Sequence, residues 1–192
     1  MEKFKGKYRI PSARWAAWDY GHNAAYFITI CTANRDHYFG KIVNGEMIVS
    51  AIGQSALNCW HEVPAHFPFV VLDEFVVMPN HVHGIVVIDK PVDVETRLVE
   101  TQDIASLRDE PKNKFGPQSK NLASIVRGYK IGVTKYARQN NLPFAWQARY
   151  HDHVIRNADE CGQIRNYINT NPQKWTEDKF YNPPPPAKTE KM

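Results

Sequence analysis

The sequence predicts an α+β protein in which helices pack against an antiparallel β-sheet. Segments 24–32 and 70–89 are rich in β-branched and aromatic residues, as strands are. Segments 120–140 and 157–171 instead repeat apolar residues at helical spacing. The elements follow one another in the order β-β-β-α-β-β-α-β-α, an order that favours helices layered on an antiparallel sheet.

Each element of the first half carries its own signal. Asn44-Gly45, between "HYFGKIV" and "GEMIVS", predicts the turn of a β-hairpin. Residues 50–68 are expected to form one helix, because apolar residues recur at helical spacing and two prolines close the segment: Ile52, Ala56, Leu57 and Trp60, then Pro64 and Pro68. A tight Pro79-Asn80 turn then divides 70–89 into two strands.

The second half begins with a change of composition. Residues 90–119 are charged and aperiodic, and we expect a mobile insert or long loop there. The last helix is expected to begin after Asn157, an N-cap residue with Glu160 three positions on. A single domain is therefore expected over 1–175, followed by a proline-rich tail over 176–192.

Composition favours a cytoplasmic protein. The 192 residues carry a net charge of +4 and are 43% hydrophobic, which is enough for a core. The three cysteines, Cys31, Cys59 and Cys161, lie too far apart for a metal motif or a disulfide framework, so we expect reduced thiols. No signal peptide is expected, and no apolar run approaches the ~18 residues of a membrane span.

Two histidines open the strand that follows the Pro79-Asn80 turn. Side chains alternate along a strand, so His81 and His83 point the same way with Cα atoms roughly 6–7 Å apart. Two imidazoles at this separation can converge on one divalent cation. The alternative is a structural pair, in which each ring is hydrogen-bonded to backbone or to a carboxylate.

A second His-x-His pattern occurs at His151 and His153, in a short strand predicted over 151–156. Its middle residue is Asp152, which cannot face a core at low cost. This pair therefore fits an exposed or edge position, and we regard it as a possible accessory to the site.

The last helix offers a further candidate ligand. Tyr167 and Asn171 lie four residues apart and share one helical face, beside an apolar stripe of Cys161, Ile164 and Ile168. A tyrosine in this position can also be only a cover for the core.

Taken together, these motifs resemble the single-tyrosine HUH nucleases, and more closely the REP-associated tyrosine transposases and related insertion-sequence transposases. The matching pieces are "VVMPNHVHGIVVI", "SIVRGYK", "WQARYHDHVIRN" and "IRNYINTNPQKW", in that order, together with "YFITICTANR". The insertion-sequence enzymes usually have glutamine at the position of Asn171, whereas the REP-associated branch has asparagine.

The resemblance implies a ferredoxin-like sheet with His81 and His83 on a central strand. Tyr167 would be the nucleophile, and Asn171 would complete the metal ligands. The implied activity is cleavage and rejoining of single-stranded DNA beside an imperfect, REP-like hairpin, through a 5′-phosphotyrosine intermediate. A mixed nitrogen and oxygen ligand set suits Mg²⁺ or Mn²⁺, although Zn²⁺ also binds paired imidazoles. A nucleoid-associated monomer or homodimer is expected.

A basic stretch supplies the expected DNA contacts. From 111 to 151 the chain has no acidic residue and eight basic ones: Lys112, Lys114, Lys120, Arg127, Lys130, Lys135, Arg138 and Arg149. Phosphate contact is favoured over a merely solvated face. Two rival functions stay open: a ferredoxin-like nucleic-acid-binding module without catalysis, and a metal-dependent hydrolase that uses bound water.

Overall fold

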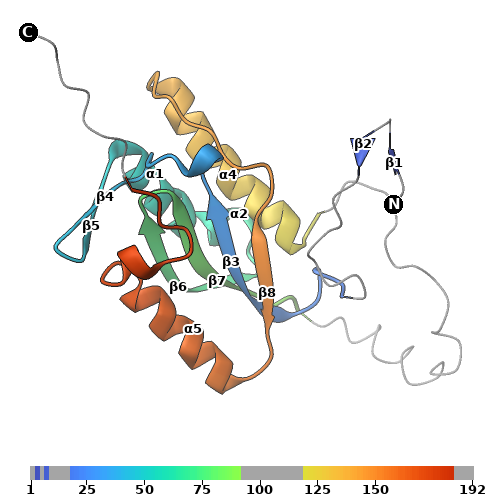
Figure 1. Ribbon diagram of the computed structural model, residues 1–192. Helices are drawn as coiled ribbons and strands as arrows, with labels where there is room; N and C mark the ends of the chain where they lie inside the picture. Colours follow the sequence, from blue (N-terminus) through green and yellow to red (C-terminus); the bar gives the residue numbers. More distant parts are fainter. Residues whose placement is uncertain (1–2, 5–6, 9–17, 92–118, 184–192) are drawn as a thin grey trace, which may run out of the picture.

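The computed structural model describes residues 18–91 and 119–183, and the backbone of 3–4 and 7–8. A four-stranded antiparallel sheet lies at its centre, in the order β6-β7-β3-β8 (Figure 1). The strands are β3 (Ala24–Cys31), β6 (Val70–Met78), β7 (His81–Ile88) and β8 (His151–Ile155). β7 is therefore an inner strand, flanked by β6 and β3, while β8 lies at one edge.

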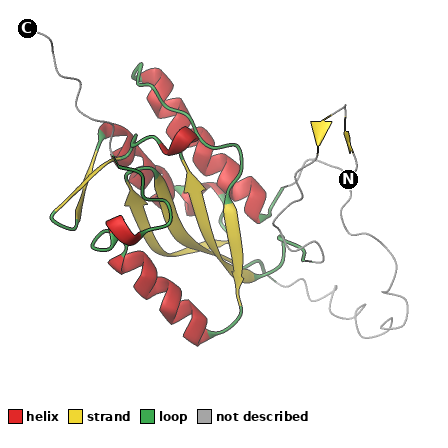
Figure 2. Ribbon diagram, in the orientation of Figure 1, coloured by secondary structure: helices red, strands yellow, loops and turns green. Residues whose placement is uncertain are grey.

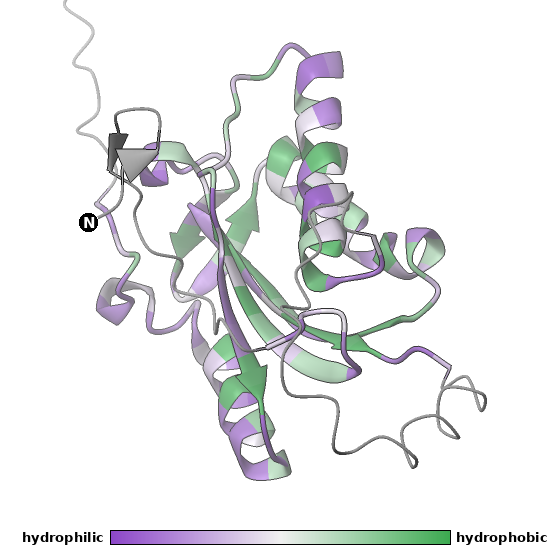
Figure 3. Ribbon diagram, turned by 90° about the vertical axis from the view of Figure 1, so that its right-hand side faces the viewer, coloured by the Kyte–Doolittle hydropathy of each residue, from purple (hydrophilic) through white to green (hydrophobic). Residues whose placement is uncertain are grey.

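Helices cover both faces of this sheet. α1 (Ala51–His61), α2 (Val63–His66) and α4 (Leu122–Gln139) lie on one face, and α5 (Ala158–Thr170) lies on the other (Figures 1 and 3). β7 lies between β3 and β6 and pairs with both, and α1 lies in the connection between those two strands. This is the split βαβ arrangement of ferredoxin-like folds. The predicted α+β fold class, with its antiparallel sheet and packed helices, is confirmed.

The smaller elements surround this framework (Figure 2). β4 (Gly40–Val43) and β5 (Glu46–Val49) form the predicted hairpin, whose Asn44 and Gly45 both have positive φ, as a tight two-residue turn requires. Short β1 (Lys3–Phe4) pairs with β2 (Lys7–Tyr8), a pairing that the sequence did not predict. Two 3₁₀ turns, η1 (Ala33–Arg35) and η2 (Trp175–Glu177), complete the elements of the described residues.

The single helix expected over 50–68 is two helices. α1 begins after Ser50, whose hydroxyl accepts a hydrogen bond from the amide of Gly53, and ends at His61. Pro64 then lies in the first turn of α2. Proline has no amide hydrogen to donate to residue 60 and its ring would crowd that carbonyl, so the chain starts a new helix instead.

Alternation along β7 divides its side chains between two environments. Val82 and Val86 face α1 and α4, within a buried core that includes Trp60 and Ile125. His81, His83 and Ile85 face the opposite side, and all three are fully buried. The α5 helix covers that side and is anchored by buried Ile168. The strand therefore places both histidines under the helix that carries Tyr167.

No helix within the described part of the chain is long and apolar enough to span a membrane. The predicted insert lies almost wholly outside the described residues, because 92–118 are not among them. The same holds for residues 184–192 of the predicted tail.

Candidate active site

The two histidines of β7 converge as the sequence predicts. The Nε2 atoms of His81 and His83 lie 3.0 Å apart. Neighbouring ligands of an octahedral cation with bonds near 2.1 Å are about 3 Å apart, so this spacing fits two ligands of one ion. The pair is buried beneath α5 and the segment that follows it.

Neighbouring side chains orient both imidazole rings. Asn80 donates its amide Nδ2 to the carbonyl of Phe180 and accepts, through Oδ1, a 2.8 Å hydrogen bond from Nδ1 of His81. The proton of His81 is therefore on Nδ1, and its Nε2 is free to bind a cation. Thr29 Oγ1 lies 2.8 Å from Nδ1 of His83 and can hold that ring in the same tautomer.

Both imidazoles are held in the neutral form. Burial lowers the pKa of His81 to about 3, and the positive charges of Arg35 and Lys179 add to the effect. Burial, together with neighbouring His81, also holds the pKa of His83 well below its ordinary value. Neutral imidazole is the form that binds a metal, so the protonation state of the pair is compatible with a cation.

Tyr167 reaches the histidine pair from α5. Its hydroxyl lies 3.1 Å from Nε2 of His83 and donates to Oδ2 of Asp178 at 3.1 Å. Its ring packs edge-on against Phe27 and His83. Burial raises the pKa of the phenol, and the negative charge of Asp178 raises it further. Because the side chain is 38% exposed, a substrate can reach it from solvent.

Asn171 caps the C-terminus of α5 one turn beyond Tyr167. Its Nδ2 donates to Oδ2 of Asp178 at 2.8 Å. Its Oδ1 is buried and has no hydrogen-bond partner, which is costly for an amide oxygen. The free Oδ1 of Asn171 is therefore available to bind a group from outside the chain, such as a metal ion.

Asp178 is the residue that sequence reasoning missed. The ligand atoms of His81, His83 and Asp178 all lie within 4.8 Å of one another, so the three can hold one metal ion. Asp178 is one of several acids in a stretch without periodicity, at the start of the predicted tail, and no sequence signal distinguishes it. The turn that follows α5 carries it back onto the histidines.

The donor set fits a hard divalent cation. It contains two imidazole nitrogens, one carboxylate and one unpaired amide oxygen, a mixture that Mn²⁺ and Mg²⁺ accept with positions left for other oxygens. A pocket of about 250 Å³ opens beside Tyr167, Asn171 and Asp178 and connects this corner with solvent.

The chain beyond Asp178 closes one side of the site. The Phe180 ring is buried, with its centroid 4.8 Å from that of His81. Arg35 lies over the Phe180 ring and also donates to the carbonyl of Lys179. Arg35 and the preceding Asn34 both have positive φ, an uncommon backbone for non-glycine residues. The tail predicted over 176–192 thus begins at the site, and its residue Phe180 is buried.

The second histidine pair is divided between two environments. The His151 ring lies 6.3 Å from the ring of Phe180, at the margin of the site. His153 instead donates from Nε2 to Oε1 of Glu160 at 2.7 Å, which ties β8 to the first turn of α5. Only His151 therefore lies beside the first pair.

Four of the predicted DNA-contacting cations lie on α4, on the other face of the sheet. Arg127, Lys130, Lys135 and Arg138 line one groove along α4. Lys120 precedes that helix and lines a different pocket, and Arg149 is exposed two residues before β8. Lys112 and Lys114 lie outside the described residues. The structure thus gathers four of the six described cations.

Comparison with known proteins places the chain among its relatives. No protein-family model matches it. A protein of Haemophilus influenzae, described only as an uncharacterized protein, is 39% identical over 171 residues, which are 88% of this chain and 92% of the relative. The chain belongs to the family of that Haemophilus protein. Identity of this extent over most of both chains means that the two proteins share one fold.

A solved structure shares the fold. A REP-associated tyrosine transposase, bound to a REP hairpin, aligns with 89% of this chain and 77% of its own length, with a TM-score of 0.55 and 18% identity. At this level of identity the likeness concerns the fold. It establishes that the chain shares its overall fold with that transposase.

Proposed function

We propose that the protein is a metal-dependent single-stranded DNA endonuclease and strand transferase, which cleaves and rejoins DNA beside an imperfect hairpin. The observation that carries the proposal is the tyrosine hydroxyl 3.1 Å from Nε2 of His83, in a cluster whose Asn171 oxygen is buried without a partner. Support also comes from the transposase of the same fold, which is bound to a hairpin.

In this proposal Tyr167 is the nucleophile. Its oxygen attacks the scissile phosphorus, a Tyr–O–P bond forms, and the bond from phosphorus to the 3′ oxygen breaks. The products are a 5′-phosphotyrosine and a free 3′ hydroxyl, because the departing 3′ oxygen takes a proton from solvent water. The reverse attack by a 3′ hydroxyl restores the phosphodiester and releases the tyrosine. Because the covalent link retains the phosphodiester bond, rejoining requires no nucleotide cofactor.

Asp178 has the position of a proton acceptor. Its Oδ2 already accepts the hydrogen bond of the Tyr167 hydroxyl, so it can take the proton as the phenol attacks. This matters because burial and the carboxylate raise the pKa of the phenol, which leaves little phenolate at neutral pH. On rejoining, the same carboxyl can return the proton to the leaving phenolate.

His81, His83 and Asn171 are the proposed metal ligands, with Asp178 close enough to join them. A divalent ion at this point, Mg²⁺ or Mn²⁺, would polarise the phosphate and offset the charge that develops on its oxygens. The chain itself fixes the two rings through Asn80 and Thr29 and excludes water from one side with Phe180.

Denaturing electrophoresis tests the proposal. Protein mixed with hairpin DNA labelled at its 3′ end and Mn²⁺ should form a labelled adduct that survives denaturation. Tyr167→Phe removes the hydroxyl and little packing, so it should fold and form no adduct. Tyr136→Phe, on α4 at the opposite face of the sheet, is the matched control and should react like the wild type.

Each rival function predicts a different result. A nucleic-acid-binding module without catalysis would bind the hairpin and give neither adduct nor cleavage at any metal concentration. A hydrolase using bound water would still cleave after Tyr167→Phe. An adduct that persists in the Tyr167→Phe variant would assign the nucleophile to another tyrosine.

A further inference from the structure

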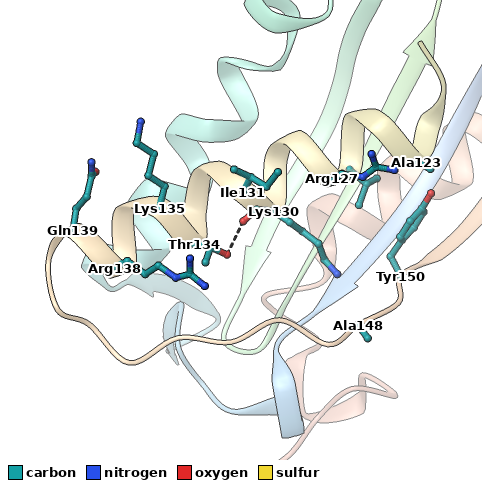
Figure 4. Close-up of a pocket in the computed structure, with 11 residues that line it drawn as sticks. Ala123, Arg127, Lys130, Ile131, Thr134, Lys135, Arg138, Gln139, Ala148 and Tyr150 are labelled. Carbon is teal, nitrogen blue, oxygen red and sulfur yellow. Dashed lines mark hydrogen bonds between the residues drawn. The ribbon is translucent and has the colours of Figure 1, made fainter. Parts of the chain in front are cut away.

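A groove lies between α4 and the chain that returns from it to β8. Its volume is about 710 Å³, within the ~300–1,000 Å³ of small-molecule sites. The helix supplies one wall, and Ala148 and Tyr150 of the returning chain supply the other (Figure 4). This groove is on the face of the sheet opposite to Tyr167 and is separate from the pocket beside it.

The lining of the helix wall follows one stripe of α4. Arg127, Ile131, Thr134 and Arg138 recur at intervals of three or four residues and so share one face. Figure 4 shows Arg127, Lys130 and Arg138 on the side of the helix that faces the returning chain, whereas Lys135 points away from it.

The two walls are held together by hydrogen bonds. Lys130 donates from Nζ to the carbonyl of Gln147 at 2.6 Å, and the indole of Trp146 donates to the carbonyl of Lys130 at 3.1 Å. The Lys130 ammonium also lies over the Trp146 ring. These contacts fix the returning chain against the helix, so the groove is preformed.

Charge and surface character together identify the class of ligand. No acidic side chain is among the described residues that line the groove, and Arg127 and Arg138 are exposed without an ion pair to any described residue. The lining also includes apolar Ala123, Ala148 and Ile131, and Ile131 is 59% exposed. The groove therefore offers phosphate contacts beside surfaces on which flat rings can pack.

Unpaired nucleotides match this combination better than a duplex. A single strand presents both phosphates and the faces of its bases, and apolar and aromatic side chains bind those faces. A duplex keeps its bases stacked inside and presents mainly phosphates to a groove of this kind, so the apolar lining would gain no contact.

The position of the groove relates it to the active site. Tyr150 lines the groove, and the next residue, His151, lies on β8 beside Phe180 at the margin of the histidine pair. β8 is an edge strand, with no further strand of the described sheet beyond it. A flexible strand can therefore pass from the histidine face around this edge to α4.

We propose that the α4 groove binds unpaired nucleotides of the DNA strand that Tyr167 cleaves. The inference rests on the proposed function for the identity of that strand. Arg127 and Arg138 contact its phosphates, and the apolar lining between them holds its bases. The groove thereby selects hairpins that carry a single-stranded extension and positions the extension relative to the histidine pair.

Fluorescence anisotropy in EDTA measures this binding without cleavage. The probes are one labelled hairpin with blunt ends and the same hairpin with a short oligothymidine extension. Wild-type protein should bind the extended probe about tenfold or more tightly, which is the contribution of one or two stacked bases. The Arg127→Ala/Arg138→Ala double variant should lose that preference. For the extended probe, the slope of log K against the logarithm of salt concentration should become shallower by about 1.4, because two phosphate contacts to a single strand are lost.

Two further variants separate the possible causes. Ala148→Trp fills the groove without a change of charge and should also abolish the preference for the extension. Lys41→Ala, which removes an exposed cation from the β4–β5 hairpin, is the matched control and should keep it. Thermal melting verifies that each variant is folded.

Three outcomes would overturn the proposal. Equal binding of both probes by the wild type would mean that no site for unpaired nucleotides exists. Equal weakening of both probes by the double variant would assign the two arginines to the duplex stem. Retention of the preference in Ala148→Trp would place the bases elsewhere. Adduct formation by the wild type tests the proposed cleavage activity separately. The groove proposal and the cleavage proposal can therefore fail independently.

Discussion

Each histidine of the candidate site depends on a partner from another part of the chain. Asn80 precedes the strand and orients His81, whereas Thr29 reaches His83 from the neighbouring strand. Both rings are buried, and in the neutral form their Nε2 atoms face one another at 3.0 Å. Two lone pairs so close repel unless a proton or a cation lies between them. A proton on one Nε2 makes the contact a hydrogen bond between the rings, whereas a cation would accept both lone pairs.

Replacing either histidine should separate cleavage from binding. We expect His81→Ala and His83→Ala each to abolish cleavage, because the metal loses a ligand, and to leave hairpin affinity largely unchanged, because binding rests on phosphate contacts. Cleavage assays, anisotropy and thermal melting measure the three properties. His151→Ala, at the margin of the site, should have the milder effect.

Two results would contradict this expectation. Loss of folding and binding together in both variants would favour the structural pair. A His151→Ala variant as inactive as the other two would include the second pair in the site.

At the scale of elements, β7 must serve two faces at once. The residue after His83 is Gly84, which points toward the stacked rings of Trp60 and Phe75, whose centroids are 4.2 Å apart. A Cβ atom at Gly84 would lie 2.5 Å from the Trp60 ring and 2.9 Å from Phe75. Only glycine lets the two rings approach β7 so closely. The opposite face of the same strand carries His81 and His83.

We therefore expect Gly84→Ala to destabilise the protein by about 1–3 kcal/mol, the usual cost of overpacking a core. A lower melting temperature and reduced cleavage should appear together, because the strand must shift to accommodate the methyl group. Gly162→Ala on α5 is the matched control, since nothing lies within 4 Å of its added Cβ. Alanine there should stabilise the helix by about 0.5–1 kcal/mol. An unchanged melting temperature for Gly84→Ala would contradict this expectation, because it would mean that the Trp60 and Phe75 rings move aside without loss of stability.

At the scale of the whole molecule, the sheet separates two tasks. The α5 face holds the nucleophile and the proposed metal ligands, whereas the α4 face holds the cationic groove. The chain after α5 crosses the first of these faces, where Asp178 and Phe180 contact the site before the proline-rich stretch begins. The described part of the chain ends at residue 183, five positions after Asp178.

Deleting residues 182–192 should change the cleavage rate or the hairpin affinity without lowering the melting temperature. The reason is that consecutive prolines extend the chain by about 3.1 Å per residue and contribute no backbone donors to a core. Steady-state cleavage, anisotropy and calorimetry on the full chain and the truncation give the comparison. If kinetics and affinity are identical, the stretch is only a spacer.

Much of the fold and half of the candidate site follow from local sequence. Alternation along a strand places His81 and His83 on one side, and helical spacing places Tyr167 one turn before Asn171. The N-cap at Asn157 was also predicted, and its Oδ1 accepts the amide of Glu160 at 2.8 Å. These features depend on backbone periodicity, which neighbouring residues impose by themselves.

Only the tertiary structure decided the rest, because it depends on contacts between residues far apart in the chain. The approach of Tyr167 to His83 spans 84 positions, and that of Thr29 to His83 spans 54. Asp178 carries no pattern that separates it from neighbouring acids, and the turn after α5 alone brings it to Tyr167. The basic residues of α4 were evident as charges, but the wall that makes them a groove is the returning chain. Local periodicity sets the direction in which a side chain points, whereas packing sets what it meets.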